Sequence, residues 1–272
     1  MIEFKIKPLL DVQDVLATWS MVIHNRPADS GPVRREQRDT LTEQIKPLME
    51  QLDTDEFKLC KRGAERLIET LDKHGDSVRI ASAVDDLRRR LLDQAELTSC
   101  LSLSQKEKEL YQPPRPLFGQ DFDGKFLTAG SFELEEAAKC LALSRPTAGV
   151  FHLMRLMEIG VAAVARCLGI PDPTKPRDRN WGFILGEIKK DLDARSGTAT
   201  SPPTKSWVDS ADRALFESAY GSLDAVRVAW RNPTMHVENK YMPNEAEHVF
   251  VAVRGFMTKL ASRCDENGDP KA

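Results

Sequence analysis

An arginine and a histidine lie five positions apart near the C-terminal end of the chain, at Arg231 and His236. A guanidinium group is planar and permanently charged, so it can grip two phosphate oxygens at once. An imidazole titrates near neutral pH and can accept or donate a proton while a phosphate is attacked. The pair therefore suits cleavage of a phosphodiester. In RNA, the strand's own 2′-hydroxyl can be the attacking group, so this chemistry requires no metal.

The backbone between the two residues decides whether they can meet. In an uninterrupted helix, a spacing of five residues places two side chains about 140° apart. Pro233 lies between them; it disfavours helical conformation at Asn232 and removes a backbone donor. We therefore expect the helix to end or kink here. Arg231 would then lie at a helix C-terminus, where its charge suits the helix dipole, and His236 in the connection that follows.

At these residues the chain resembles the HEPN superfamily, a group of small all-α domains marked by an arginine, four to six residues and a histidine. The segment from Arg231 to His236 fits the four-residue version and places a polar residue, Asn232, directly after the arginine. A long helix is expected before the motif and another helix after it, as in the family. The resemblance covers roughly residues 131–264.

The resemblance implies a metal-independent endoribonuclease without a cofactor, acting as a homodimer whose two motifs face each other across a shared cleft. Arg231 would bind phosphate and stabilise the transition state, His236 would act as general acid or base, and Asn232 would orient the phosphate or the histidine. The products would carry 2′,3′-cyclic phosphate and 5′-hydroxyl ends. Family members serve in toxin–antitoxin and antiviral defence systems. The expected partners are therefore RNA, a second copy of the chain, and an antitoxin or other defence protein.

An upstream helix expected over Thr147–Leu168 carries three further polar candidates for the cleft. They are His152, Arg155 and Glu158, which are spaced about one helical turn apart. Glu158 is a candidate to orient Arg231 or to pair with Arg155. For His152 a structural role is the stronger interpretation, although it could still lie in the cleft.

Helical periodicity dominates the chain, so we expect an all-α fold with a helical N-terminal region and a HEPN-like bundle after it. Between Asp55 and Lys73, for example, apolar residues recur at helical spacing and leave charges on the opposite face. In the first half, helices are expected over Leu9–Ile23, Val33–Leu52, Asp55–Lys73 and Ser77–Leu101. In the second half, they are expected over Phe132–Leu143, Thr147–Leu168, Trp181–Ala194, Ser210–Trp230 and Asn244–Cys264.

Composition suggests where these helical regions are divided. Prolines and glycines break the periodic pattern over residues 113–130, so this segment is expected to be a linker. Residues 1–112 would form an N-terminal helical region of unknown role, residues 131–264 the HEPN-like domain, and residues 265–272 a frayed tail. The N-terminal region would position substrate, form dimer contacts or bind a neutralising partner.

Charge and cysteine usage narrow the class of protein further. Residues 1–112 carry 18 Lys+Arg and 21 Asp+Glu, and residues 113–272 carry 21 of each, so neither half favours broad nonspecific binding to phosphate. The run Arg88-Arg89-Arg90 follows two aspartates, and a solvated helix face with local ion pairs is a stronger interpretation than an RNA-binding patch.

The five cysteines include no C-x-x-C pair, which argues against a zinc site and for reduced thiols. We expect a cytoplasmic protein that does not cross a membrane.

Two other functions fit the same residues. A non-catalytic helical dimer would bind a nucleotide or a partner protein, keeping Arg231 for phosphate recognition and His236 for structure. A scaffold in a defence operon would use the N-terminal half as its interaction surface. Some members of the family carry a tyrosine two residues after the histidine, and a partner antitoxin neutralises them by modifying it. In this chain that position is Glu238 and the nearest tyrosine is Tyr241, so neutralisation of this kind is not expected.

Overall fold

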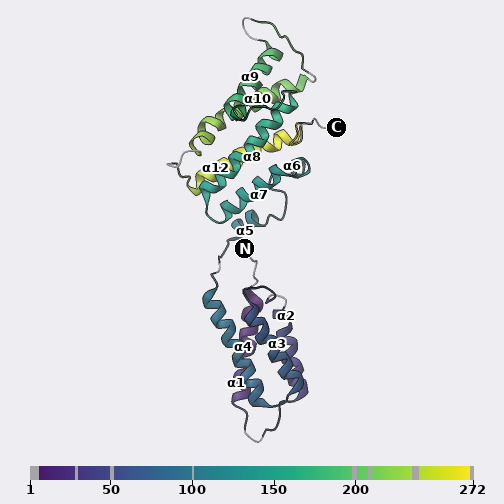
Figure 1. Ribbon diagram of the computed structural model, residues 1–272, viewed down its shortest axis with the longest axis vertical. Coiled ribbons are helices and arrows are strands. Elements are labelled where there is room, and N and C mark those ends of the chain that lie inside the picture. The colour runs from purple at the N-terminus through teal and green to yellow at the C-terminus, as the bar shows by residue number, and fades with distance from the viewer. Residues whose placement is uncertain are drawn as a thin grey trace. The chain divides into compact units, whose positions relative to one another are not determined.

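The computed structural model describes residues 6–27, 30–49, 52–99, 101–197, 201–207, 210–234 and 239–269. Over these residues it contains helices and no β-strand, which confirms the all-α fold class (Figure 1). The chain divides into two compact units, Met1–Leu101 and Ser102–Ala272. Each unit has a hydrophobic core of its own.

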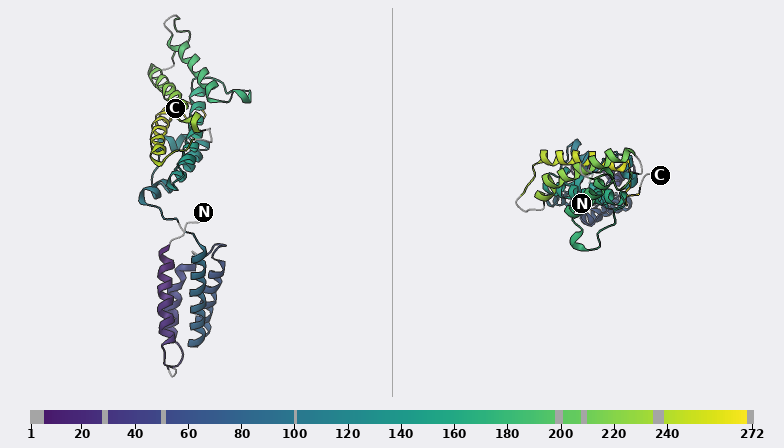
Figure 2. Two further views of the ribbon diagram at one scale, coloured as in Figure 1. Left: turned by 90° about the vertical axis from the view of Figure 1, so that its left-hand side faces the viewer. Right: turned by 90° about the horizontal axis from the view of Figure 1, so that it is seen from above.

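The first unit is a four-helix bundle. Each helix packs against the next along the chain, and the fourth closes the bundle against the first (Figures 1 and 2). Its helices are α1 (Ile6–His24), α2 (Arg35–Met49), α3 (Lys58–Lys73) and α4 (Ser77–Leu97). All four expected helices of this region are present, with shorter bounds for α2, α3 and α4.

The apolar stripe of α3 shows why this bundle forms. Cys60, Ala64, Leu67 and Leu71 recur every three or four residues and are almost completely buried. They pack into one core with apolar side chains from the other three helices. The charged residues of α3 remain on the outer face, so the sequence pattern alone accounts for which side of the helix faces inward.

The second unit is built around one long central helix, α8 (Pro146–Cys167), which contacts α7, α9 and α12. Pro146 begins this helix, where its missing N–H is harmless, and Gly169 follows its end with a positive φ of 76°. The other elements of the unit are α5 (Gln105–Tyr111), α6 (Gln120–Lys125), α7 (Ala129–Ala142), η1 (Pro176–Asp178), α9 (Trp181–Ser196), α10 (Ser210–Val226), η2 (Arg227–Arg231), α11 (Asn232–Thr234) and α12 (Pro243–Ala261).

The segment over residues 113–130 is not a linker, contrary to the expectation from its prolines and glycines. It contains α6, and Phe118, Phe122 and Phe126 are buried in the core of the second unit. The ring of Phe118 contacts that of Phe250 on α12 with 5.3 Å between centroids. Burial of three large aromatic rings outweighs the local helix-breaking signals. The boundary between the units therefore lies earlier, at residues 101 and 102.

Residues 265–269 are not frayed either. The Arg166 guanidinium on α8 donates a hydrogen bond to the carbonyl of Glu266, and the Glu266 side chain accepts one from the hydroxyl of Thr128. Gly268 has a φ of 83°, and its Cα lies so close to the end of α8 that a Cβ would meet the Cys167 backbone nitrogen at 2.7 Å. A glycine is required at this close approach. These contacts hold the segment against the second unit.

Helix α8 is long and apolar enough to span a membrane by length and composition. Of its most apolar stretch of residues, 61% is buried inside the structure. The core helix of a globular domain is equally long and apolar, so the length and composition of α8 do not distinguish a membrane-spanning helix from a buried core helix.

Candidate functional site

The backbone at the motif changes from an α-helix to a wider π-helical turn. Helix α10 ends at Val226, η2 follows over Arg227–Arg231, and the backbone N–H of Asn232 donates to the carbonyl of Arg227, five residues earlier. Asn232 keeps helical dihedral angles (φ −63°, ψ −48°), so the expectation that Pro233 would exclude it from helical conformation is wrong. A proline ring clashes with the carbonyl four residues before it in an α-helix, and a π turn is a common site of such local adjustment.

Arg231 ends this π turn, with three quarters of its side chain buried. Its Nη2 atom lies 3.4 Å from Oε1 of Glu158 on α8, whose side chain is half exposed. The Nε atom of Arg231 is buried, and no described residue forms a hydrogen bond with it. Of the two partners expected for Glu158, the structure thus brings it to Arg231. Because this pair is long and no other described residue bonds to the terminal nitrogens of Arg231, these nitrogens keep donors for another anion.

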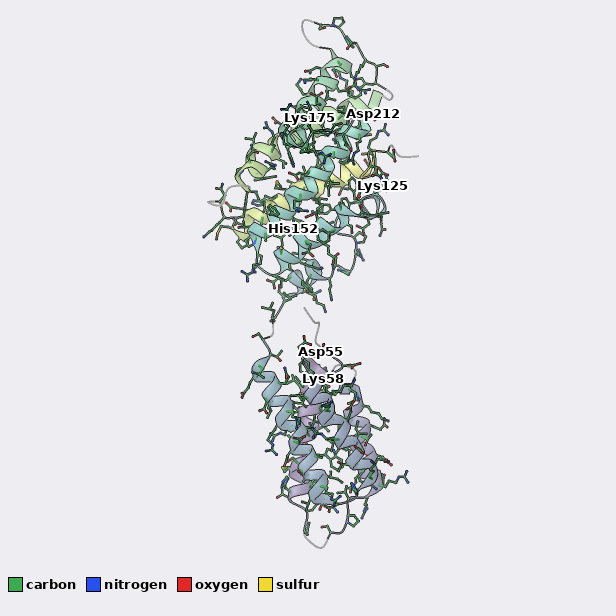
Figure 3. The ribbon with its side chains drawn as sticks, in the orientation of Figure 1. Asp55, Lys58, Lys125, His152, Lys175 and Asp212 are labelled. Atoms are coloured by element: carbon green, nitrogen blue, oxygen red, sulfur yellow. The ribbon has the colours of Figure 1, made fainter. Side chains whose placement is uncertain are left out.

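His152 and Arg155 belong to a separate cluster on α8, centred on a carboxylate that the sequence analysis missed. Glu133 on α7 is almost completely buried, and it accepts hydrogen bonds from Nδ1 of His152 at 2.8 Å and from Nε of Arg155 at 2.7 Å (Figure 3 labels His152). The cluster connects α7 to α8 directly. Around the buried carboxylate of Glu133, the cluster thus forms a polar connection between the two helices, in which the side chain of Arg155 remains half exposed.

A signal for Glu133 was present in the sequence. It lies next to Leu134 and one turn before Ala137, both on the buried face of α7. A carboxylate at a core-facing helical position must be paired, because burying an isolated charge is costly. The periodicity of α7 therefore marked Glu133 as a residue in need of a cationic partner, although it could not name the partner.

The residues on either side of the candidate histidine are tied to the motif. His236 itself lies outside the described residues, as do its neighbours from 235 to 238. On the near side, the Thr234 hydroxyl bonds to the carbonyl of Trp230. On the far side, the amide group of Asn239 donates to the carbonyl of Pro233 at 2.9 Å.

Tyr241 fixes the chain further along the same connection. Its hydroxyl lies 2.8 Å from that of Thr234 and donates to the carbonyl of Trp230, while its backbone N–H donates to the hydroxyl of Thr147 on α8. Tyr241 thus connects the motif to the start of the central helix. Trp230 is partly buried and packs against the core of the unit.

The site brings together some of the predicted residues and separates others. Arg231 and Glu158 meet, Asn232 is exposed beside them, and His152 and Arg155 bind Glu133 instead. Within the described ranges there is no group of three or more histidine, cysteine or acidic residues that could hold a metal ion.

Comparison of the chain with protein-family models, with curated proteins and with solved structures finds no match. The resemblance to HEPN domains therefore stays a prediction from the motif residues and the helices expected around them.

Proposed function

We propose that the second unit is a metal-independent endoribonuclease of HEPN type, with Arg231 and His236 as its catalytic pair. The observation that supports this most directly is the placement of Arg231. Its guanidinium is held at the end of a π turn by a single long ion pair to Glu158, in the described part of the chain. Such an arginine is preorganised, yet it keeps donors for a phosphate group.

In this proposal each residue has one task. Arg231 binds the non-bridging oxygens of the scissile phosphate and stabilises the charge that develops there. His236 moves the proton: it takes it from the attacking 2′-hydroxyl or gives it to the leaving 5′-oxygen. Asn232, exposed on the turn after Arg231, donates an amide hydrogen bond to the phosphate or to the histidine. The bond between phosphorus and the 5′-oxygen breaks, and a 2′,3′-cyclic phosphate remains.

Before substrate binds, Glu158 forms an ion pair with the guanidinium of Arg231. Because the side chain of Glu158 is half exposed, its pair with Arg231 is weak and can yield to a phosphate, which accepts two hydrogen bonds from the same group. The second copy of the chain in a homodimer would supply a second pair to the cleft. A role in toxin–antitoxin or antiviral defence belongs to the same proposal.

The test is cleavage of a labelled RNA in the presence of EDTA, followed by analysis of the fragment ends. We expect the wild-type protein to produce 2′,3′-cyclic phosphate ends. His236→Ala and Arg231→Ala should each lower the cleavage rate at least 100-fold, because general acid–base catalysis and oxyanion stabilisation each contribute about 10² or more.

Two matched variants serve as controls. His248→Ala removes an exposed histidine from α12, and Arg213→Ala removes an exposed arginine from α10 that pairs with Glu217 on its own helix. Both should cleave RNA at the wild-type rate. If His236→Ala and wild type give the same background, the nuclease proposal fails. Nucleotide binding that survives in His236→Ala would then favour the non-catalytic binding dimer.

A further inference from the structure

A groove in the first unit, between α3 and α4, is lined mainly by basic and hydroxyl side chains. It has a volume of about 690 Å³. Arg66, Thr70 and His74 line it from α3, and Arg79, Ser82 and Arg89 line it from α4. These positions follow one face of each helix, so the groove runs along the pair of helices. We call it the α3–α4 groove.

The charges in this groove are mostly uncompensated. Neither Arg79 nor Arg89 pairs with a carboxylate among the residues that the structure describes; the Nε atom of Arg89 donates to the backbone carbonyl of Asp85. The one acidic residue in the lining, Asp86, accepts a hydrogen bond from Nε of Arg90 at 2.9 Å and lies 3.6 Å from Arg66. The hydrogen bond from Arg90 lowers the pKa of Asp86, with smaller contributions from the charges of Arg66 and Arg89, so this carboxylate stays ionised and offsets only part of the positive charge in the groove.

Three uncharged residues without hydroxyl groups, Gly63, Val78 and Ala83, also belong to the lining, and a Cβ at Gly63 would lie 3.0 Å from the stem of Arg90. Among the described residues, no Phe, Tyr or Trp lines the groove. The lining therefore offers mainly charge and hydrogen-bond donors, with no extended aromatic platform for successive bases.

The spacing of the arginines fits a chain of anions better than a single anion. Arg79 and Arg89 are ten residues apart on one helix, or about 15 Å along its axis. Arg66 lies across the groove from Asp86, towards the Arg89 end. Guanidinium groups at both ends of a groove of this length can contact phosphates about two nucleotides apart on one extended strand.

We propose that the α3–α4 groove binds the phosphodiester backbone of single-stranded RNA without regard to sequence. The choice of RNA rests on the function proposed for the second unit, whereas the preference for a phosphodiester strand comes from the groove itself. The groove explains how a chain with no excess of basic residues can hold RNA, since the positive charge is concentrated at one local site. The three residues of the run Arg88-Arg89-Arg90 have different surroundings. Arg89 lines the groove, Arg90 donates a hydrogen bond to Asp86, and Arg88 does not line the groove.

The experiment measures binding of the full chain to a fluorescein-labelled 15-nucleotide oligouridylate with 2′-O-methyl groups, by anisotropy, over a range of KCl concentrations with EDTA. The methylated strand has no free 2′-hydroxyl, so binding is measured independently of cleavage. The groove variant Arg79→Gln/Arg89→Gln is compared with Arg35→Gln/Arg88→Gln. Both remove two exposed arginines from the first unit, but Arg35 pairs with Asp39 and neither control residue lines the groove.

We expect the groove variant to bind at least tenfold more weakly than wild type at 100 mM KCl. The slope of log K against log[salt] should become shallower by about 1.4, or roughly 0.7 for each lost phosphate contact. The binding constant of the control variant should stay within a factor of two of that of the wild type.

Equal weakening in the groove and control variants would overturn the proposal, as would unchanged binding in both. Displacement of the oligonucleotide by poly-glutamate at the same charge concentration would overturn the preference for a phosphodiester. Circular dichroism melts of both variants check that they are folded.

Discussion

Three carboxylates among the described residues are buried, and each is held by cations. Glu133 binds His152 and Arg155, Asp212 binds Arg263, and Asp191 on α9 binds Arg195 and Lys205. These contacts join elements that are separate in the chain: α7 to α8, α10 to the segment after α12, and α9 to the loop that follows it. The elements of the second unit are therefore joined by buried ion pairs of single carboxylates as well as by apolar packing.

Asp191 gives a pH-dependent prediction. Burial raises the pKa of its carboxyl, but the hydrogen bonds from Lys205 and Arg195 outweigh burial and hold the pKa below its ordinary value. A lowered pKa stabilises the fold above the unfolded value of about 3.9, and this stabilisation is lost as the pH falls through the folded value. Asp191→Asn should cost about 3 kcal/mol at pH 7, and the difference from wild type should shrink below about pH 4.

Urea unfolding between pH 7 and pH 3 measures this difference. Asp193→Asn is the matched control, because Asp193 lies on the same helix and pairs with Lys189 at the surface. Its effect should be below about 0.5 kcal/mol. A difference between wild type and Asp191→Asn that stays constant down to pH 3 would contradict the assignment.

At the scale of elements, α8 organises the second unit by making close contacts along its length. It packs against α7, α9 and α12, and it carries both Glu158 and the residues bound by Glu133. Where α8 crosses α12, Gly160 lets the helices approach: a Cβ there would lie 2.9 Å from both Sδ of Met257 and the ring of Phe256. The position of Glu158 opposite Arg231 depends on this packing.

Two alanine substitutions across this helix pair should have opposite effects. Gly160→Ala should lower the free energy of unfolding by about 1–3 kcal/mol, because Met257 is fully buried and must shift. Gly255→Ala, on the exposed face of α12 with nothing within 4 Å, should raise it by about 0.5–1 kcal/mol through better helix propensity. Chemical denaturation measures both. A stabilising Gly160→Ala would show that the two helices are not closely packed there.

At the scale of the whole molecule, the chain has two cores with no member in common. One is formed by residues of α1–α4 and their connections, and the other by residues from Phe118 to Cys264. Because each core is complete within its own unit, each unit satisfies the ordinary requirement for a domain. The two proposed activities also separate along this division, with the groove in one unit and the Arg231 site in the other.

Independent cores predict independent unfolding. Leu67→Ala, in the first core, should remove about 2–5 kcal/mol from one transition and leave the other unchanged. Leu153→Ala, in the second core, should do the reverse. Calorimetry of the two variants, together with limited proteolysis near residues 101 and 102, separates the transitions. A single transition that both substitutions shift equally would refute the independence of the units.

The sequence predicted most of the helices well, and its errors have identifiable causes. The stripe of Cys60, Ala64, Leu67 and Leu71 predicts both a helix and its buried face, because periodicity is a local property. Residues 113–130 were misjudged as a linker because prolines and glycines also act locally. The burial of Phe118 against Phe250 depends on residues more than a hundred positions apart, which no local pattern contains.

For the candidate site, the sequence by itself determined the chemistry available: the arginine–histidine spacing, the polar residue directly after the arginine and the proline that disturbs the helix. Only the tertiary structure decided which side chains meet. In the tertiary structure Glu158 pairs with Arg231 rather than with Arg155, His152 and Arg155 bind the buried Glu133, and arginines from two helices line one groove. The physical reason is that residue type and helical spacing are properties of one segment, whereas ion pairs and grooves form between segments that only packing brings together.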